Sequence, residues 1–187
     1  MGNPDMTRKT GTTAGLAWEH AVHDIPGSGL STVREAIPEE LAFIGHALDL
    51  IACKSLRTEY AIAPTVGGHY RLSGRLRAEV SQACVVTLEP IDSMIEEEFE
   101  AVFWPREDMP APESGELDID DGPEREPIVA GHMAVGRVVF ESLAAAIDPF
   151  PRKPDAVLDS QSATPANAVA GKPESPFAVL SNLKTKD

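Results

Sequence analysis

The chain has 187 residues, with 16 Lys and Arg against 30 Asp and Glu, so its formal net charge is −14. That length suits one domain of ordinary size with additional terminal segments. The acidic balance argues against a protein that holds nucleic acid through a general positive field, although a local basic face stays compatible with it. Two cysteines are too few for a secreted disulfide framework, and no run of about 18 apolar residues predicts a membrane helix. We therefore expect a cytoplasmic protein.

The first part of the chain predicts a flexible terminus, a strand and a helix. Residues 1–14 are rich in Thr, Gly and charge, which is typical of a flexible N-terminus. Apolar residues alternate from Leu16 to Val22, which predicts a strand that the turn at 26–29 ends. Pro38 and the two acids after it suit the first turn of a helix over about 37–50. The residues predicted to face the core from this helix are Leu41, Ile44, Leu48 and Ile51.

The middle of the chain predicts a sheet. Alternation over 56–62 and 70–80 predicts two strands joined by a Gly-Gly loop, the second with one solvated face. Residues 84–88 predict a further short strand, and 95–103 predict another. Because short loops join successive strands, we expect a mostly antiparallel sheet that could curl towards a barrel.

The last part of the chain predicts an acidic loop, a second helix and a tail. Residues 105–127 hold five prolines and a dense acidic run, typical of a flexible loop. Apolar residues at helical spacing predict a helix over Val135–Ile147, which the segment 148–151 ends. Residues 156–187 predict a largely disordered tail with an apolar patch over 177–183 that could dock on the core or on a partner. We thus expect one α+β domain over 15–155 with two main helices.

No enzymatic template fits the sequence. It has no Gly-rich phosphate loop, no nucleophile elbow and no His-Glu-x-x-His helix. A spacing of three on a strand places His20 and His23 on opposite faces, which is poor for a shared metal. Cys84 has no flanking His or Lys to lower its pKa, so a buried apolar role is favoured. We expect no catalytic residue, no metal and no cofactor.

One concentrated basic feature lies between residues 54 and 77. Three of its arginines would project from one strand face at about 7 Å per residue pair, near the phosphate spacing of an RNA strand. Tyr60, Tyr70 and His69 could add stacking surfaces, although a core position suits Tyr60 and Tyr70 equally well. The alternative, which the residues alone favour, is a solvated face whose arginines pair with Glu96, Glu98 and Glu100 of a neighbouring strand. The candidate RNA-binding residues are Lys54, Arg57, Arg71, Arg75 and Arg77.

A family resemblance enters at residues 82–90, which read Gln-Ala-Cys-Val-Val-Thr-Leu-Glu-Pro, and at the acidic strand that ends in Phe103-Trp104-Pro105. These strings resemble the YceD family of large ribosomal RNA subunit accumulation proteins, in its alphaproteobacterial form. Segments 74–78, 148–154 and 176–180 agree with the family in order, so the resemblance covers about 15–155 and part of the tail. The family-motif residues are Cys84, Leu88, Glu89 and Pro90.

The chain departs from the family pattern at two places. Many members read Cys-x-Arg-Cys-Leu, and here Val86 and Thr87 stand in place of the Arg and the second Cys, so a metal or redox role of paired cysteines cannot apply. Residues 133–137 read Met-Ala-Val-Gly-Arg where members usually read Ile-Asp-Leu-Gly-Glu. The loss of both acids puts in doubt any role they had, including capping of the second helix.

The resemblance implies a non-enzymatic factor in 23S ribosomal RNA processing or stability that acts in large-subunit assembly. The implied partners are ribosomal RNA or pre-50S particles, with a basic ribosomal protein or an assembly factor as further candidates. The alternative is a protein-binding adaptor without direct RNA contact. Exposure of the five cations on one face would favour RNA binding, whereas pairing with the acidic strand would favour the adaptor.

Overall fold

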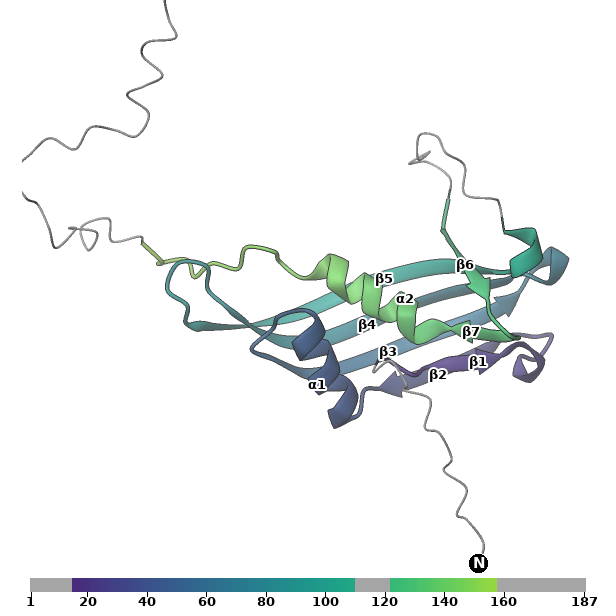
Figure 1. Cartoon of the computed structure of the whole chain (residues 1–187), viewed down its shortest axis with the longest axis horizontal. Coiled ribbons are helices and arrows are strands. Elements are labelled where there is room, and N and C mark those ends of the chain that lie inside the picture. The colour runs from purple at the N-terminus through teal and green to yellow at the C-terminus, as the bar shows by residue number, and fades with distance from the viewer. Residues whose placement is uncertain (1–14, 110–121, 158–187) are drawn as a thin grey trace, which may run out of the picture. The chain divides into compact units, whose positions relative to one another are not determined.

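A computed structural model describes residues 15–109 and 122–157, which form two sheets and two helices (Figure 1). The strands are β1 (Glu19–Ala21), β2 (Leu30–Glu35), β3 (Ala52–Pro64), β4 (Tyr70–Ala83), β5 (Pro90–Pro105), β6 (Glu124–Ile128) and β7 (His132–Ala134). The helices are α1 (Pro38–Ala47) and α2 (Val135–Ala146). Single turns of 3-10 helix span Val22–Asp24, Val66–Gly68 and Arg106–Asp108.

The large sheet is open and mostly antiparallel. Its strand order is β2-β3-β4-β5-β6, and only the β5–β6 pair is parallel. The α+β class is therefore confirmed. The sheet does not close into the barrel that the strand pattern left possible, because β2 and β6 end the sheet without pairing with each other. Closure is not needed to bury the inner face, since helices and the small β1–β7 sheet supply apolar residues to the same core.

The inner face of the large sheet carries the alternating apolar residues that the sequence predicts. Leu56, Thr58, Tyr60 and Ile62 of β3 are all buried, and β4 buries Leu72, Leu76, Ala78 and Val80 in the same way. Helix α2 packs along β4 and β5 (Figure 1) and buries Val135, Val138, Val139 and Leu143. The predicted helix over 135–147 is thus confirmed in position and in its buried face.

The start of α2 is fixed by close contact with the N-terminal segment. The backbone N–H of Gly136 donates a hydrogen bond of 2.9 Å to the carbonyl oxygen of Trp18. A Cβ on Gly136 would lie only 2.1 Å from the carbonyl oxygen of Leu16, so no larger residue fits without movement. Ala134 at the N-cap makes no side-chain hydrogen bond, which agrees with the missing family acid at this position.

Helix α1 packs against β3 and begins with a side-chain cap. Glu40 accepts a hydrogen bond of 3.0 Å from the backbone N–H of Ile37, and its other oxygen accepts one of 2.9 Å from the indole of Trp18. The helix ends at Ala47, earlier than expected, and Ile44 is its fully buried residue. The prediction that Ile51 faces the core is wrong, because Ile51 lies beyond the helix and is 55% exposed.

Several strands differ from the sequence predictions. The alternation from Leu16 forms only a three-residue strand, after which a 3-10 turn follows. The predicted short strand at 84–88 is wrong, because these residues form a turn in which the Leu88 N–H donates to the Cys84 carbonyl oxygen at 2.9 Å. Strand β6 begins inside the predicted acidic loop and ends one residue beyond it, and β2 and β7 lie where no strand was predicted.

Three predictions concern parts of the chain outside the described residues. They are the flexible N-terminus, most of the acidic loop and the tail with its apolar patch. In the described part of the chain, no helix combines the length and the apolar character needed to cross a membrane.

Candidate interaction surface

The outer face of the large sheet carries a ladder of arginines and glutamates. Because β4 and β5 are antiparallel, Arg77 lies opposite Glu96 and Arg75 lies opposite Glu98. The Arg75 Nη2 to Glu98 Oε1 distance is 2.5 Å, and Arg77 contacts Glu96 in the same way. Arg71 reaches Glu100 diagonally, with 2.6 Å between Nη1 and Oε1. The pairing expected as the alternative to RNA binding is therefore present.

The two remaining candidate cations are also paired. Lys54 Nζ lies 2.7 Å from Asp92 Oδ2 and 3.2 Å from Glu79 Oε1. Arg57 contacts Glu35 at 2.6 Å and Glu59 at 3.1 Å. The hydrogen bond to Asp92 raises the pKa of Lys54 above its usual range, and the same bond lowers the pKa of Asp92.

These contacts define a charge ladder of five cations and seven carboxylates, whose net charge is −2 (Lys54, Arg57, Arg71, Arg75, Arg77; Glu35, Glu59, Glu79, Asp92, Glu96, Glu98, Glu100). The arginines of β4 stay exposed, with side-chain exposures of 55%, 64% and 62% for Arg71, Arg75 and Arg77. The β4 arginines are thus exposed, which favours RNA binding, and they also pair with the acidic strand, which favours the adaptor. A phosphate approaching this face would have to displace a carboxylate and would remain close to others, so the ladder is not a positive patch.

The stacking surfaces expected beside the arginines lie elsewhere. Tyr60 is buried on the inner face, where its hydroxyl lies 2.8 Å from Nε2 of His20. Tyr70 packs against the same core. His69 stacks on Trp104 with ring centroids 4.3 Å apart. Of the two positions left open for the tyrosines, the core is confirmed and the stacking surface beside the arginines is wrong, because the period of two places tyrosines and arginines on opposite faces of the sheet.

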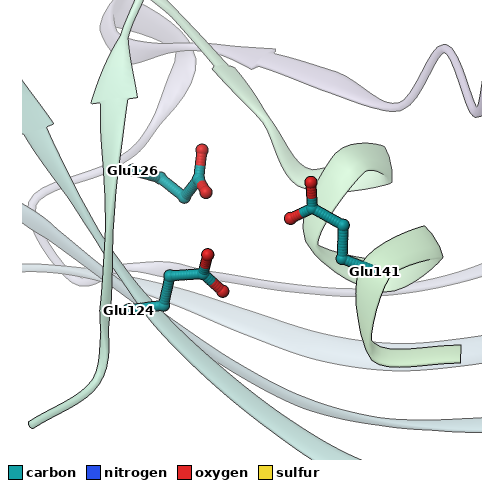
Figure 2. Close-up of side chains that lie close together, drawn as sticks. All are labelled: Glu124, Glu126 and Glu141. Atoms are coloured by element: carbon teal, nitrogen blue, oxygen red, sulfur yellow. The ribbon is translucent and has the colours of Figure 1, made fainter. Parts of the chain in front are cut away.

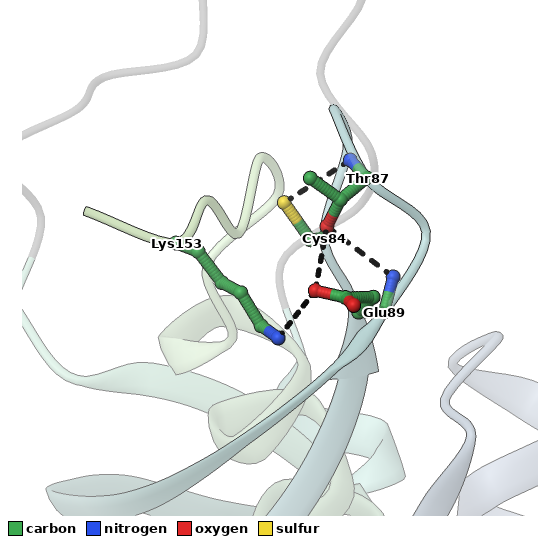
Figure 3. A network of polar contacts seen from close by, with 4 residues as sticks. All are labelled: Cys84, Thr87, Glu89 and Lys153. Atoms are coloured by element: carbon green, nitrogen blue, oxygen red, sulfur yellow. Dashed lines mark hydrogen bonds and ion pairs between the residues drawn. The ribbon is translucent and has the colours of Figure 1, made fainter. Parts of the chain in front are cut away.

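The family-motif residues form the turn between β4 and β5 (Figure 3). The backbone N–H of Cys84 donates to the carbonyl oxygen of Glu89 at 2.8 Å, which closes the turn. Leu88 takes a left-handed backbone conformation with φ 61°, and its side chain is 76% exposed. Pro90 begins β5. The motif therefore has a structural role, because it connects the two longest strands, β4 and β5.

This turn contacts residues 148–154, a second segment that agrees with the family. Val85 donates its N–H to the Pro151 carbonyl oxygen at 2.9 Å, and Lys153 Nζ lies 2.7 Å from Glu89 Oε2. Gln82 adds a side-chain hydrogen bond of 2.9 Å to the Asp148 carbonyl oxygen. Sequence reasoning missed this contact, because nothing in a Glu and a Lys 64 residues apart indicates that they meet.

The thiol of Cys84 is buried within this turn. Hydrogen bonding from Thr87, first from its side chain, and from backbone N–H groups that include that of Lys153, lowers the pKa of Cys84 to about 6. The expected burial of Cys84 is therefore confirmed, and the groups that lower its pKa come from the turn and from a distant segment rather than from flanking residues. The thiol is 0% exposed, so the structure holds it away from solvent.

An acidic cluster lies between β6 and α2 (Figure 2). The carboxylates of Glu124, Glu126 and Glu141 point towards one another, and their oxygens lie within 4.8 Å of one another. Among the described residues, they are the one group of three potential ligands close enough to hold a metal ion together. Glu126 is 3% exposed, and burial raises its pKa. Arg137 contacts Glu126 at 3.3 Å and Glu141 at 2.9 Å. It is the residue at the position where members of the YceD family usually carry Glu. Sequence reasoning missed the cluster because it placed Glu126 in a loop.

The described residues thus define a small α+β protein with a charge-paired outer face and a motif turn tied to a distant segment. The family model described as Large ribosomal RNA subunit accumulation protein YceD matches residues 72–184. That range covers more than half of the chain, so the chain belongs to this family and has a role in large-subunit ribosomal RNA accumulation. No curated protein and no solved structure matches the chain.

Proposed function

We propose that this protein is a non-enzymatic factor in 23S ribosomal RNA processing or stability, and that it acts in the cytoplasm on pre-50S particles through contacts with their proteins. The family supplies the link to large-subunit ribosomal RNA. The preference for protein contacts is supported by one observation, the charge ladder. Its five cations contact seven carboxylates, so this face offers RNA no net positive charge.

Direct RNA binding by the ladder is the second candidate function. The observation that favours it is the exposure of Arg71, Arg75 and Arg77, each of which is more than half exposed. Exposed ion pairs contribute only about 0–1 kcal/mol each, so RNA phosphates would lose little by breaking them. The cost would come from the glutamates left unpaired beside the phosphates.

Pull-down of the tagged full-length protein from cells tests the first proposal. We expect recovery of large-subunit precursors and their proteins, and we expect the same recovery from the variant Arg71→Ala/Arg75→Ala/Arg77→Ala. Recovery of neither precursor RNA nor large-subunit proteins would overturn the proposed role. Loss of recovery in the arginine variant alone would favour direct RNA binding by the ladder.

Binding to 23S fragments across a salt series separates the two candidates. If the arginines contact RNA, their removal should lower the slope of log affinity against log salt by about 2, which is about 0.7 for each of three lost phosphate contacts. The matched variant Glu96→Gln/Glu98→Gln/Glu100→Gln keeps all three arginines and removes their partners, so it should strengthen such binding. Under the protein-contact proposal neither variant changes the affinity or its salt dependence.

A further inference from the structure

Strand β5 has an open edge along much of its length. Strand β6 pairs with β5 only over Ala101–Pro105, at one end of the strand (Figure 1). Residues 91–100 pair with β4 on one side, and no strand in the described part of the chain pairs with their other side. In an antiparallel ladder alternate residues direct N–H and C=O groups towards the neighbouring strand, and the residues between direct theirs away. The free side of β5 therefore offers a row of backbone donors and acceptors.

This edge is strongly acidic. Residues 89–100 contain six acids and no base (Glu89, Asp92, Glu96, Glu97, Glu98, Glu100). A second copy of the chain pairing edge to edge would bring like charges together, which is unfavourable for cross-strand neighbours. The charge instead complements a segment that carries Lys or Arg. Open edges that accept an added strand gain affinity from the backbone and specificity from the side chains.

A groove runs beside the open edge, between β5 and α2. Its lining residues are Glu97, Glu98, Phe99, Glu100, Glu124, Val138, Ser142, Ala145 and Ala146. Glu97 forms no ion pair with another described residue, and Glu124 belongs to the acidic cluster, in which Arg137 contacts Glu126 and Glu141. Phe99 and the alanines supply an apolar lining, and Glu97 and Glu124 supply negative charge. Such a groove suits a long side chain with an aliphatic stem and a cationic head, as Lys and Arg have.

We propose that the edge of β5 over residues 91–100 binds an extended, Lys- or Arg-bearing segment of a partner protein as an added strand, with one cationic side chain in the groove beside Glu97 and Glu124. The inference rests on the proposed function and deepens it, because it names the surface through which the protein contacts are made. Two independent features carry it: the unpaired backbone of β5 and the acidic groove that runs beside the same strand.

Fluorescence anisotropy with the full chain tests the proposal. The probe is a labelled peptide of alternating Lys and Val, which has the period of a strand. A matched peptide with N-methyl groups on alternate amides keeps the charge and loses edge hydrogen bonds, and it should bind at least about tenfold more weakly. Amide hydrogen exchange should show protection at residues 91–100 when the first peptide is added. Equal affinity of the two peptides, or protection on β2 instead, would overturn the proposal.

Charge-reversal variants locate the site. Glu97→Lys/Glu124→Lys should weaken binding by about tenfold or more, because both substitutions place a cation in the groove. The control Glu19→Lys/Glu39→Lys makes the same net-charge change at exposed positions of β1 and α1, and it should change affinity less than about threefold. Thermal unfolding checks that both variants are folded. Equal losses of affinity in the two variants would refute a specific groove. Weaker peptide binding at high protein concentration would also refute it, because it would mean that a second copy of the chain occupies the same edge.

Failure of this inference and failure of the proposed function give different results. If the groove variant still recovers large-subunit precursors from cells as well as the wild type does, the β5 edge is not the contact surface, although the proposed function stands. If the wild type recovers none, the proposed function fails, whatever the peptide does.

Discussion

Replacing Gly136 by Ala should destabilise the fold, because this glycine lets the start of α2 touch the N-terminal segment. A Cβ at this position would lie 2.1 Å from the Leu16 carbonyl oxygen and 2.8 Å from the Leu16 Cβ. Ordinary van der Waals contacts between such heavy atoms begin at about 3.5 Å, so α2 must move away from Leu16. The movement also lengthens the 2.9 Å hydrogen bond between the Gly136 N–H and the Trp18 carbonyl oxygen.

The expected loss follows from three contributions. Overpacking at a close contact costs about 1–3 kcal/mol. Weakening of the buried hydrogen bond costs about 1 kcal/mol. The better helix propensity of Ala offsets about 1 kcal/mol of this. We therefore expect the free energy of unfolding to fall by about 1–3 kcal/mol, which with a denaturant slope of about 2 kcal/mol/M lowers the urea midpoint by about 1 M.

Urea denaturation followed by tryptophan fluorescence measures this loss, since Trp18 is buried at the same contact. The matched control is Gly27→Ala. A Cβ on Gly27 meets nothing within 4 Å, so this variant should be as stable as the wild type or slightly more stable. A Gly136→Ala midpoint equal to or above that of Gly27→Ala would refute the close-contact reasoning.

Three further predictions address burial and titration. Ile44 is 0% exposed and Ile51 is 55% exposed. In urea denaturation, Ile44→Ala should therefore lower the free energy of unfolding by about 2–5 kcal/mol, and Ile51→Ala should lower it by less than about 1 kcal/mol. Similar losses in the two variants would contradict the observed end of α1. Arg137→Met should cost about 1–3 kcal/mol at pH 7 by leaving the buried Glu126 uncompensated. Because burial raises the pKa of Glu126, the carboxylate takes up a proton as the pH falls through that pKa, and the penalty for its unpaired charge disappears. The deficit of Arg137→Met should therefore shrink as the pH is lowered from 7 towards the ordinary range of a Glu carboxyl; an unchanged deficit would argue against Glu126 as its cause. A pKa of Cys84 lowered to about 6 means that the folded state binds fewer protons than the unfolded state between about pH 6 and 9. The free energy of unfolding of the wild type should therefore rise across that range relative to that of Cys84→Ser. Urea midpoints that change in parallel with pH for the two proteins would show that the thiol is not stabilised as a thiolate.

The strands and helices that the sequence predicts well are those with long, regular patterns. Leu72, Leu76 and Val80 alternate with polar and charged residues, and this pattern alone indicates one buried and one solvated face. The charge ladder could also be foreseen, because alternating arginines on one strand and alternating glutamates on the next meet once the strands are antiparallel neighbours. The register then decides which partners form.

The elements that the sequence does not reveal are short or depend on distant contacts. Strands β2 and β6 lie at the sheet edges and carry mostly polar residues, so they lack an apolar alternation. Residues 84–88 have strand-like composition, but their backbone groups bind Glu89 and Pro151, and this turn overrides their β propensity. The acidic cluster joins Glu126 to residues of α2, and only tertiary packing brings them together.

The pairing of β1 with β7 has a consequence for folding during synthesis. Glu19 lies opposite Ala134, so β1 leaves the ribosome more than a hundred residues before its partner strand is synthesised. Helix α2 follows directly after that partner, which leaves the apolar inner face of β3, β4 and β5 without this cover until residue 146 has been made. A nascent chain stopped before that point would expose Leu72, Leu76 and Phe103, so its solubility would depend on how quickly the last segment is completed.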